Sequence, residues 1–329
     1  MCIGANRRIP AVVVAVFLLM YASPNAGQHS HQDRVKPAKN TAAESVRADV
    51  VERAVITICH ERVNDSKGTR PIDEMAFQPS LPLTDSRVIA GITRARALLP
   101  TAKRLVPFAL TKIAARENLE PLNLKWIVER SRAVTFIKGD VSERDNAAWR
   151  PSEPDTIIIG TAFLAGLRSD EALLAVLSHE LTHAIDGSDH ALQPVFARIA
   201  DTASVDVTGS HGPAAELTCE LVGIQVAQDY ISQTPNPGKT SQRLARVFQK
   251  DCVQKDLADE AHLSPRDTMR TLLTLEPSIS DAFAKGGSAK LTRQLKAAHG
   301  SARGKRSIRR SGQVLIERKR KSSSVKRRK

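Results

Sequence analysis

Two histidines and a glutamate stand close together in the stretch SHELTHAID, residues 178–186. Because residues i and i+4 lie on the same face of an α-helix, the imidazoles of His179 and His183 can reach one metal ion. Glu180 follows the first histidine, next to the position that a metal-bound water would occupy. Neutral imidazoles keep zinc Lewis-acidic, and a nearby carboxylate can accept a proton from the water. The motif HExxH therefore predicts a hydrolytic site with one Zn²⁺ per chain.

A mostly apolar helix is expected to carry this motif. Ser169 suits its capping position, and Asp170 and Glu171 suit its first turn. Asp186 and Gly187 are a plausible end. Polar side chains in so apolar a helix are costly unless they are satisfied. Two core histidines bonded to the backbone are the alternative to a metal site. The surrounding apolar residues are Leu173, Leu174, Val176, Leu177, Leu181, Ala184 and Ile185.

A third ligand can come from the next predicted helix, residues 214–230. Catalytic zinc usually takes three protein ligands and leaves one position for water. Glu216 and Glu220 lie one turn apart on this helix, on a face that is otherwise made of small residues. Such a face predicts close approach to another element, although an ordinary amphipathic helix with solvated glutamates is the alternative. The small residues are Cys219, Gly223 and Ala227.

The order of these elements resembles the gluzincin metallopeptidases, most of all the HtpX-like and CAAX-prenyl endopeptidase family. The resemblance is carried by IIIGTAFLAGLRSDEALLAVLSHELTH, residues 157–183, and by ELTCELVG, residues 216–223. It implies a zincin-type domain that cleaves peptide bonds of protein substrates. It further implies zinc ligands and a general base. The implied ligands are His179, His183 and Glu216, and the implied base is Glu180.

Two further positions follow from the resemblance. Glu220 takes the place behind the ligands where the family usually has Asp after Ala, and here the pair is Cys219 and Glu220. The family also has a downstream histidine that helps to stabilise the oxyanion, commonly beside a proline. His262 in AHLSPRDTMR is the candidate, with its proline displaced to Pro265, and His211 is the competitor.

The substrate is expected to bind along a strand edge. The segment NAAW, residues 146–149, is similar to the family's Asn-Ala-aromatic stretch before the substrate-edge strand. Residues 156–160 (TIIIG) are expected to be that exposed edge strand. An extended peptide would pair with it through its main chain.

A different third ligand remains open. In metzincins the motif continues as HExxHxxGxxH, so the third ligand lies six residues after the second histidine. Here that position is Asp189, and His190 is one residue out of register. The glycine that the turn requires is replaced by Asp186. A metzincin-type peptidase with Asp189 as ligand is therefore the lesser alternative.

Helical spacing dominates the body of the chain. The predicted fold is α+β and mostly helical. The resemblance implies that it is a zincin-type domain with a small sheet, an HExxH helix and a second ligand-bearing helix. Other helices are predicted at residues 44–63, at 88–117 with interruptions at Pro100 and Pro107, and at 241–298 with breaks near Pro265 and Pro277. Strands are predicted at residues 122–128, 133–138 and 156–160, and polar connections at 67–86, 139–154 and 187–213.

The formal net charge of +14 lies almost wholly at the C-terminal end. Residues 286–329 hold sixteen Lys and Arg against one acid, whereas residues 1–285 hold 33 basic and 34 acidic side chains. We expect a largely disordered basic tail, which could contact an anionic envelope or membrane surface. With no aromatic residue after Phe283, a specific nucleic-acid partner is not expected. The alternative function is an envelope- or nucleic-acid-binding protein that works through this tail, with a structural or inactive zinc site.

The N-terminal segment predicts export. Two arginines precede a fourteen-residue apolar run at residues 9–22, shorter than the roughly 20 residues of a spanning helix. Residues 1–27 are therefore interpreted as a signal peptide or an uncleaved membrane anchor of a periplasmic or secreted protein. Residues 28–43 are expected to be a linker, and residues 44–285 the metallopeptidase domain.

Three cysteines follow this segment, and an oxidising compartment permits one disulfide. Cys219 and Cys252 are the expected pair because they lie closer to each other in sequence than either does to Cys59. Buried, unpaired thiols are the alternative.

Overall fold

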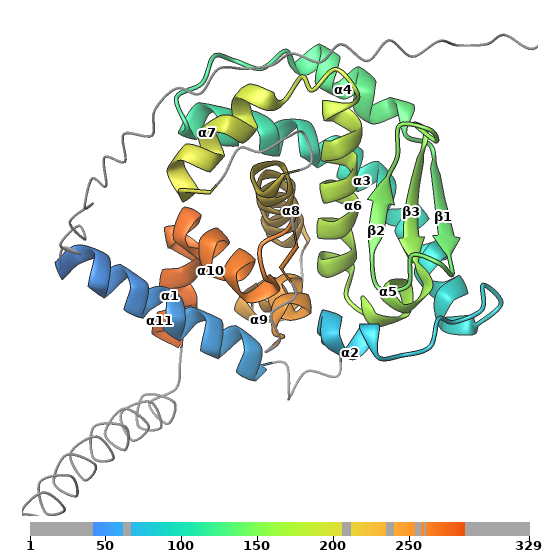
Figure 1. Cartoon of the computed structure of the whole chain (residues 1–329), viewed down its shortest axis with the longest axis horizontal. Coiled ribbons are helices and arrows are strands. Elements are labelled where there is room, and N and C mark those ends of the chain that lie inside the picture. The colour runs from blue at the N-terminus through green and yellow to red at the C-terminus, as the bar shows by residue number, and fades with distance from the viewer. Residues whose placement is uncertain are drawn as a thin grey trace, which may run out of the picture. The chain divides into compact units, whose positions relative to one another are not determined.

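Helices make up most of the described chain, and one small sheet lies beside them (Figure 1). The fold is therefore α+β and mostly helical, as the sequence predicts. The described elements belong to one unit, which begins at Thr41. The computed structural model describes residues 42–61, 67–205, 212–234, 240–253, 258–259 and 261–286.

The helix that carries the HExxH motif is α6 (Asp170–Asp186). Ser169 caps its first turn, because the side chain accepts the N–H of Ala172. Gly187 ends the helix with a φ of 63°, a conformation that glycine adopts without steric cost. Most side chains of α6 are buried, and the predicted start and end of this helix are confirmed.

The helix predicted to carry the third ligand, α8 (Pro213–Gln233), packs closely along α6. Gly223 lies at the contact, where an added Cβ would come within 2.7 Å of the carbonyl oxygen of Ala175 on α6. A larger residue would force the two backbones apart, because a packed interior has little free space. The close approach that the small residues predict is therefore confirmed.

A single long helix, α3 (Ser86–Arg116), packs against both α6 and α8. Pro100 and Pro107 lie inside it, so the predicted interruptions do not occur. Proline removes a helical hydrogen bond, but tertiary packing of a long apolar face contributes more to helix stability than local propensity does.

The segment after α3 folds as a further helix, α4 (Leu124–Ala133), and the strand predicted at residues 122–128 is wrong. Asn123 caps this helix by accepting the N–H of Trp126. The buried residues of this helix, Ile127 and Ser131, are four residues apart, which is helical and not alternating spacing, and the charged residues between them are more exposed. A short apolar run cannot by itself distinguish the two structures.

The sheet has the strand order β1-β3-β2. β1 (Phe136–Asp140) is parallel to β3 (Thr156–Gly160), and β2 (Ala147–Trp149) pairs antiparallel with the opposite side of β3. β1 overlaps the strand predicted at residues 133–138, and β2 lies in the stretch 139–154 that was expected to be a connection.

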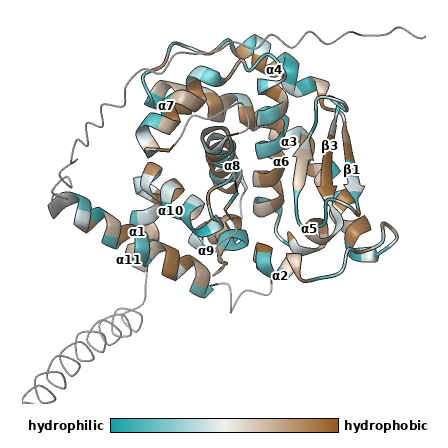
Figure 2. Cartoon of the chain, viewed as in Figure 1, coloured by the Kyte–Doolittle hydropathy of each residue, from teal (hydrophilic) through white to brown (hydrophobic). Residues whose placement is uncertain are grey.

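β3 is the central strand, so the prediction that residues 156–160 form an exposed edge is wrong. All five of its residues are buried, and Figure 2 shows β3 as hydrophobic. A continuous apolar run is typical of a strand that is covered on both faces. The edge strand that contacts α6 is β2.

The remaining helices pack around these elements. Two of them, α2 and α7, lie in the segments 67–86 and 187–213 that were predicted as polar connections, so both predictions are corrected. The apolar residues of α7 lie on one buried face, which the surrounding polar residues obscure in the sequence. The bounds are α1 (Ala42–Glu61), α2 (Ile72–Ala76), α5 (Thr161–Gly166), α7 (Gln193–Ala203), α9 (Thr240–Phe248), α10 (Pro265–Leu275) and α11 (Pro277–Gly286), with a 3₁₀ turn at Gln249–Asp251.

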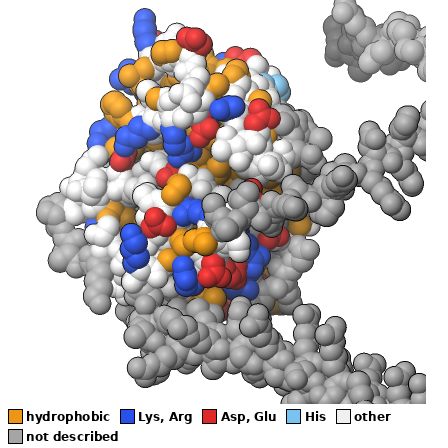
Figure 3. All heavy atoms as spheres, turned by 90° about the vertical axis from the view of Figure 1, so that its left-hand side faces the viewer, with side chains coloured by type: hydrophobic (Ala, Val, Ile, Leu, Met, Phe, Trp, Pro, Cys, Tyr) orange, Lys and Arg blue, Asp and Glu red, His pale blue; other side chains and the backbone are white. Residues whose placement is uncertain are grey.

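Charged side chains of both signs are interspersed on the face that Figure 3 shows, in keeping with the near-zero charge of residues 1–285. In the part of the chain that the structure describes, no helix is both long and apolar enough to cross a bilayer. The predicted signal or anchor, nearly all of the linker, and the basic tail beyond Gly286 lie outside the described residues.

A disulfide joins Cys59 at the end of α1 to Cys252, 193 residues later, and the predicted Cys219–Cys252 pair is wrong. Cys219 is a buried free thiol on α8. Sequence separation is a poor guide to pairing, because the tertiary fold decides which cysteines meet.

Replacing Cys59 and Cys252 together by alanine should lower the free energy of unfolding by about 2–5 kcal/mol, because the bridge constrains a long loop in the unfolded chain. Urea unfolding of the wild type and of the double variant, with and without reductant, measures this difference in stability. Cys219→Ala is the control and should keep its response to reductant. Equal stability of the oxidised and reduced wild-type protein would contradict the pairing.

Gly223→Val should lower the free energy of unfolding by about 1–3 kcal/mol, because its side chain would overlap the Ala175 carbonyl. Gln228→Val, a partly exposed position on the same helix, is the matched control and should cost about 0.5 kcal/mol. Urea unfolding followed by circular dichroism compares the two. Similar losses for both would mean that the α6–α8 contact is not tight at Gly223.

Candidate metal centre

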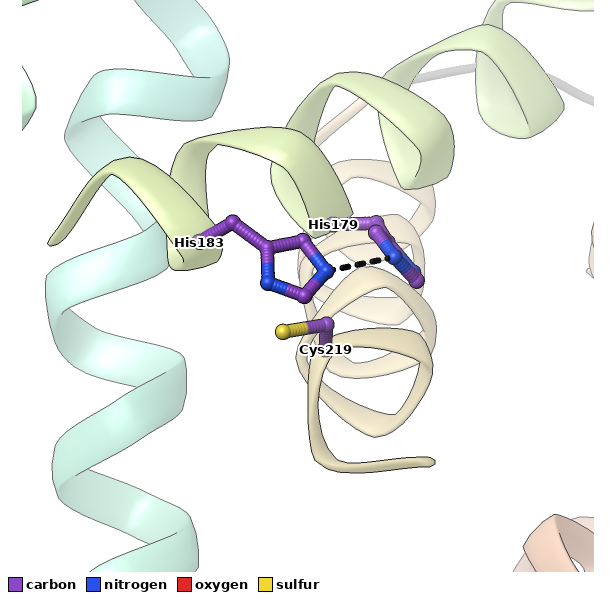
Figure 4. Close-up of side chains that lie close together, drawn as sticks. All are labelled: His179, His183 and Cys219. Atoms are coloured by element: carbon purple, nitrogen blue, oxygen red, sulfur yellow. Dashed lines mark hydrogen bonds between the residues drawn. The ribbon is translucent and has the colours of Figure 1, made fainter. Parts of the chain in front are cut away.

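The two histidines of the motif lie side by side on α6. Their Nε2 atoms are 3.1 Å apart, and the ring centroids of His179 and His183 are separated by 4.9 Å. Figure 4 shows both rings on the side of α6 that faces α8. The i, i+4 spacing therefore brings two nitrogen donors together, as the helical pattern predicts.

Glu216 on α8 places its carboxylate against both rings. Its Oε2 is 3.1 Å from Nε2 of His179, and its Oε1 is 3.3 Å from Nε2 of His183. Ligand atoms bound at 2.0–2.1 Å to a tetrahedral zinc ion are about 3.3 Å from one another. The three side chains therefore fit a zinc ion in both donor type and mutual distance.

The charges in this cluster favour a bound cation. Burial alone would raise the pKa of Glu216, but hydrogen bonds from His179, His183 and His262 hold it far below its ordinary value. Burial alone would lower the pKa of His179, but hydrogen bonds with Glu216 and Glu220 raise it well above its ordinary value. The glutamates thus attract positive charge to His179, which a divalent metal ion can supply in place of a proton.

Cys219 is a candidate ligand that the sequence argument counted only as a small residue. Its Sγ lies within 4.8 Å of ring nitrogen atoms of His179 and His183, and Figure 4 shows it beside them. Burial, followed by the charge of Glu216, raises the pKa of this thiol well above its ordinary value, whereas a zinc ligand must be a thiolate. The oxygens of Glu216 lie 3.1 and 3.3 Å from the two Nε2 atoms, close to the separation of ligand atoms around tetrahedral zinc. Glu216 is therefore the better third ligand, and Cys219 the alternative to test.

Glu180 is held beside the cluster by the edge strand. Its Oε2 accepts the backbone N–H of Trp149 on β2 at 2.8 Å, and its side chain is largely buried. Burial raises the pKa of this carboxyl above its ordinary value. A carboxylate with a raised pKa is suited to accept a proton and release it again.

His262 also reaches the site, although from a loop that precedes α10. Its Nε2 is 3.5 Å from Oε2 of Glu216, and its Nδ1 is 2.8 Å from Oδ1 of Asp259. The hydrogen bond with Glu216, together with the nearby Asp259, raises the pKa of His262 to about 9. Its competitor from the sequence, His211, lies outside the described residues.

Asp189 is engaged elsewhere. Both of its carboxylate oxygens accept hydrogen bonds from Arg130 on α4, at 2.7 and 2.6 Å. This ion pair fixes the chain just after α6, where the metzincin pattern would need a metal ligand. The geometry therefore favours Glu216 over Asp189 as the third ligand.

Glu220 lies behind His179, with Oε1 at 3.5 Å from Nδ1. Lys250 from the 3₁₀ turn donates to the same carboxylate oxygen at 2.8 Å. No local sequence pattern indicates Lys250, because it lies in a different element, 30 residues after Glu220. Asp259 was also missed, and only its spacing of three residues before His262 could have indicated it.

These side chains line a cavity of about 500 Å³. Its walls come from β2, α6, α8, the 3₁₀ turn and the segment that leads into α10. The cavity is therefore bounded on one side by the candidate ligands and on another by the edge strand β2.

Comparison of the chain with protein-family models, with curated proteins and with solved structures gives no match.

Glu216→Ala should abolish stoichiometric zinc binding, because it removes the carboxylate that faces both imidazoles. Cys219→Ala and Asp189→Ala should retain zinc, and Glu220→Ala should bind it more weakly. Elemental analysis of protein dialysed against limiting zinc measures this. Loss of zinc in Cys219→Ala with retention in Glu216→Ala would assign the third ligand to sulfur.

Proposed function

We propose that this chain is a zinc-dependent endopeptidase with a gluzincin-type site in a zincin-like domain. The observation that carries the proposal is the convergence of His179, His183 and Glu216 in one cavity, with Glu180 held next to them. A structural zinc site normally has four protein ligands and is closed to solvent. Here the best three donors border a cavity, which favours a catalytic role.

Bound zinc would lower the pKa of a coordinated water toward roughly 7 and polarise the scissile carbonyl. Glu180 accepts the proton of the attacking water and passes it to the nitrogen of the leaving amine. The N–H of Trp149 holds Oε2 of Glu180, so the second carboxylate oxygen remains available for this transfer.

The substrate main chain would bind along β2. This strand pairs with β3 on one side only, and the N–H of Trp149 is directed toward Glu180 instead of β3. Backbone groups alternate in direction along a strand, so the N–H and C=O of Ala147 face the same side as those of Trp149. Both residues line the cavity. An extended peptide can therefore add to this edge and place its carbonyl at the metal site.

His262 is suited to stabilise the negative oxygen that forms on the attacked carbonyl. Asp259 accepts a hydrogen bond from Nδ1 of His262, and Nε2 of His262 faces Glu216 in the ligand cluster. The imidazole is about half exposed, so it can meet a substrate in the cavity. A hydrogen-bond donor directed at developing charge is a strong source of rate enhancement.

The remaining parts of the proposal concern location and partners. The apolar N-terminal run would direct the enzyme to the periplasm or the exterior, with protein or peptide substrates there. The basic segment 286–329 would hold it near an anionic envelope or membrane surface. The alternative, a binding protein that works through this tail, depends on residues beyond those that the structure describes.

Glu180→Gln should keep bound zinc and lose peptide cleavage by about 100-fold or more, because the amide cannot accept the proton. Hydrolysis of an unfolded protein substrate and zinc content are measured on the same preparation. Glu129→Gln, an exposed glutamate on α4, is the control and should cleave as the wild type does. Wild-type cleavage by Glu180→Gln would overturn the proposed mechanism.

A further inference from the structure

A buried lysine lies next to the candidate metal centre and lines the same cavity. Lys250 is in the turn Gln249–Asp251 and is only 5% exposed, and its neighbour Asp251 is 3% exposed. A buried charge is costly unless it is paired and hydrogen-bonded. The ammonium of Lys250 meets this requirement with two carboxylates. It donates to Glu220 at 2.8 Å and to the oxygens of Asp251 at 3.0 and 3.1 Å.

These contacts form a continuous row that ends at a candidate zinc ligand. Asp251 holds Lys250, Lys250 holds Glu220, and Glu220 lies 3.5 Å from Nδ1 of His179. The opposite nitrogen of this ring, Nε2, faces Glu216. In zinc sites a carboxylate that accepts the second ring N–H fixes the tautomer and the orientation of the ligand.

Glu220 needs an additional contact to perform this task. A glutamate side chain has several rotatable bonds, and holding it in one conformation costs rotamer entropy. Its contact with Nδ1 of His179, at 3.5 Å, is long, whereas the contact with Lys250, at 2.8 Å, is short. Lys250 is therefore the stronger of these two restraints on the Glu220 carboxylate.

The turn that carries Lys250 is itself fixed on both sides. The side chain of Gln249 accepts the buried N–H of Thr69 at 3.0 Å. Cys252 follows the turn directly and is bonded to Cys59 on α1. The disulfide thus joins α1 to the turn that carries Lys250.

We propose that Lys250 is a positioning residue of the metal centre, which holds Glu220 against Nδ1 of His179 from a turn that the Cys59–Cys252 disulfide keeps in place. This inference rests on the proposed zinc site and deepens it. According to this proposal, zinc affinity depends on a lysine that binds no metal and on the redox state of the Cys59–Cys252 pair.

The test is a mutant cycle read as zinc affinity by competition with a chromophoric chelator. Lys250→Met should weaken zinc binding by about 10–100-fold, the usual effect of losing the support of a ligand. Glu220→Ala should weaken it similarly, and the double variant should lose no more than either single variant. Unchanged affinity in Lys250→Met, or multiplied losses in the double variant, would overturn the proposal.

Two further variants separate positioning from folding. Lys112→Met removes an exposed lysine that pairs with Asp229, and it should leave zinc affinity unchanged. Lys250→Met/Asp251→Asn removes the buried lysine together with one of its carboxylate partners. It should regain resistance to urea relative to Lys250→Met but keep the weak zinc affinity. Recovery of zinc affinity together with stability would show a purely structural role and overturn the proposal.

The disulfide is tested in the same assay. Replacing Cys59 and Cys252 by alanine should weaken zinc binding when Lys250 is intact. The same replacement should have no further effect in the Lys250→Met variant. An unaltered affinity without the disulfide would overturn this part of the proposal. A chain that shows the Lys250 dependence but cleaves no peptide would contradict the proposed function alone, whereas absence of zinc binding by the wild type would contradict both.

Discussion

The close packing of α6 against α8 is the constraint on which the rest of the structure depends. Without a Cβ at Gly223, the backbone of α8 can approach the carbonyl of Ala175 on α6. One turn before this contact is Cys219, and a further turn before it is Glu216, which therefore meets the imidazoles of α6. The separation of the two helices thus determines whether nitrogen and oxygen donors can share one metal ion.

Close packing also creates an electrostatic difficulty, because three glutamates are enclosed around one pair of histidines. The structure resolves it by giving each carboxylate a distinct partner: the imidazoles for Glu216, the N–H of Trp149 for Glu180, and Lys250 for Glu220. Partners from separate elements make the site depend on the whole fold, since β2, α6, α8 and the 3₁₀ turn must all be in place. The disulfide at Cys252 adds covalent restraint to the last of these.

Sequence patterns located the helices of the site well but described the sheet poorly. The capped, apolar helix around residues 170–186 has strong local signals, and the structure agrees with them. The run TIIIG was correctly predicted to be a strand but wrongly predicted to be an edge strand. Its apolar content predicts burial but does not show which neighbouring elements cover it. Residues 122–128 were misassigned since a short apolar run fits either a strand or one face of a helix.

The sequence by itself determined the local chemistry: the i, i+4 spacing of His179 and His183, the adjacent Glu180 and the cap of their helix. These features depend on neighbours within one element, and the 3.6-residue helical repeat is enough to infer them. Only the tertiary structure decided that β2, and not β3, is the edge strand beside α6, that Cys59 pairs with Cys252, and that a buried lysine contacts Glu220. Each of these joins segments far apart in the chain, and no local periodicity specifies which distant segments meet.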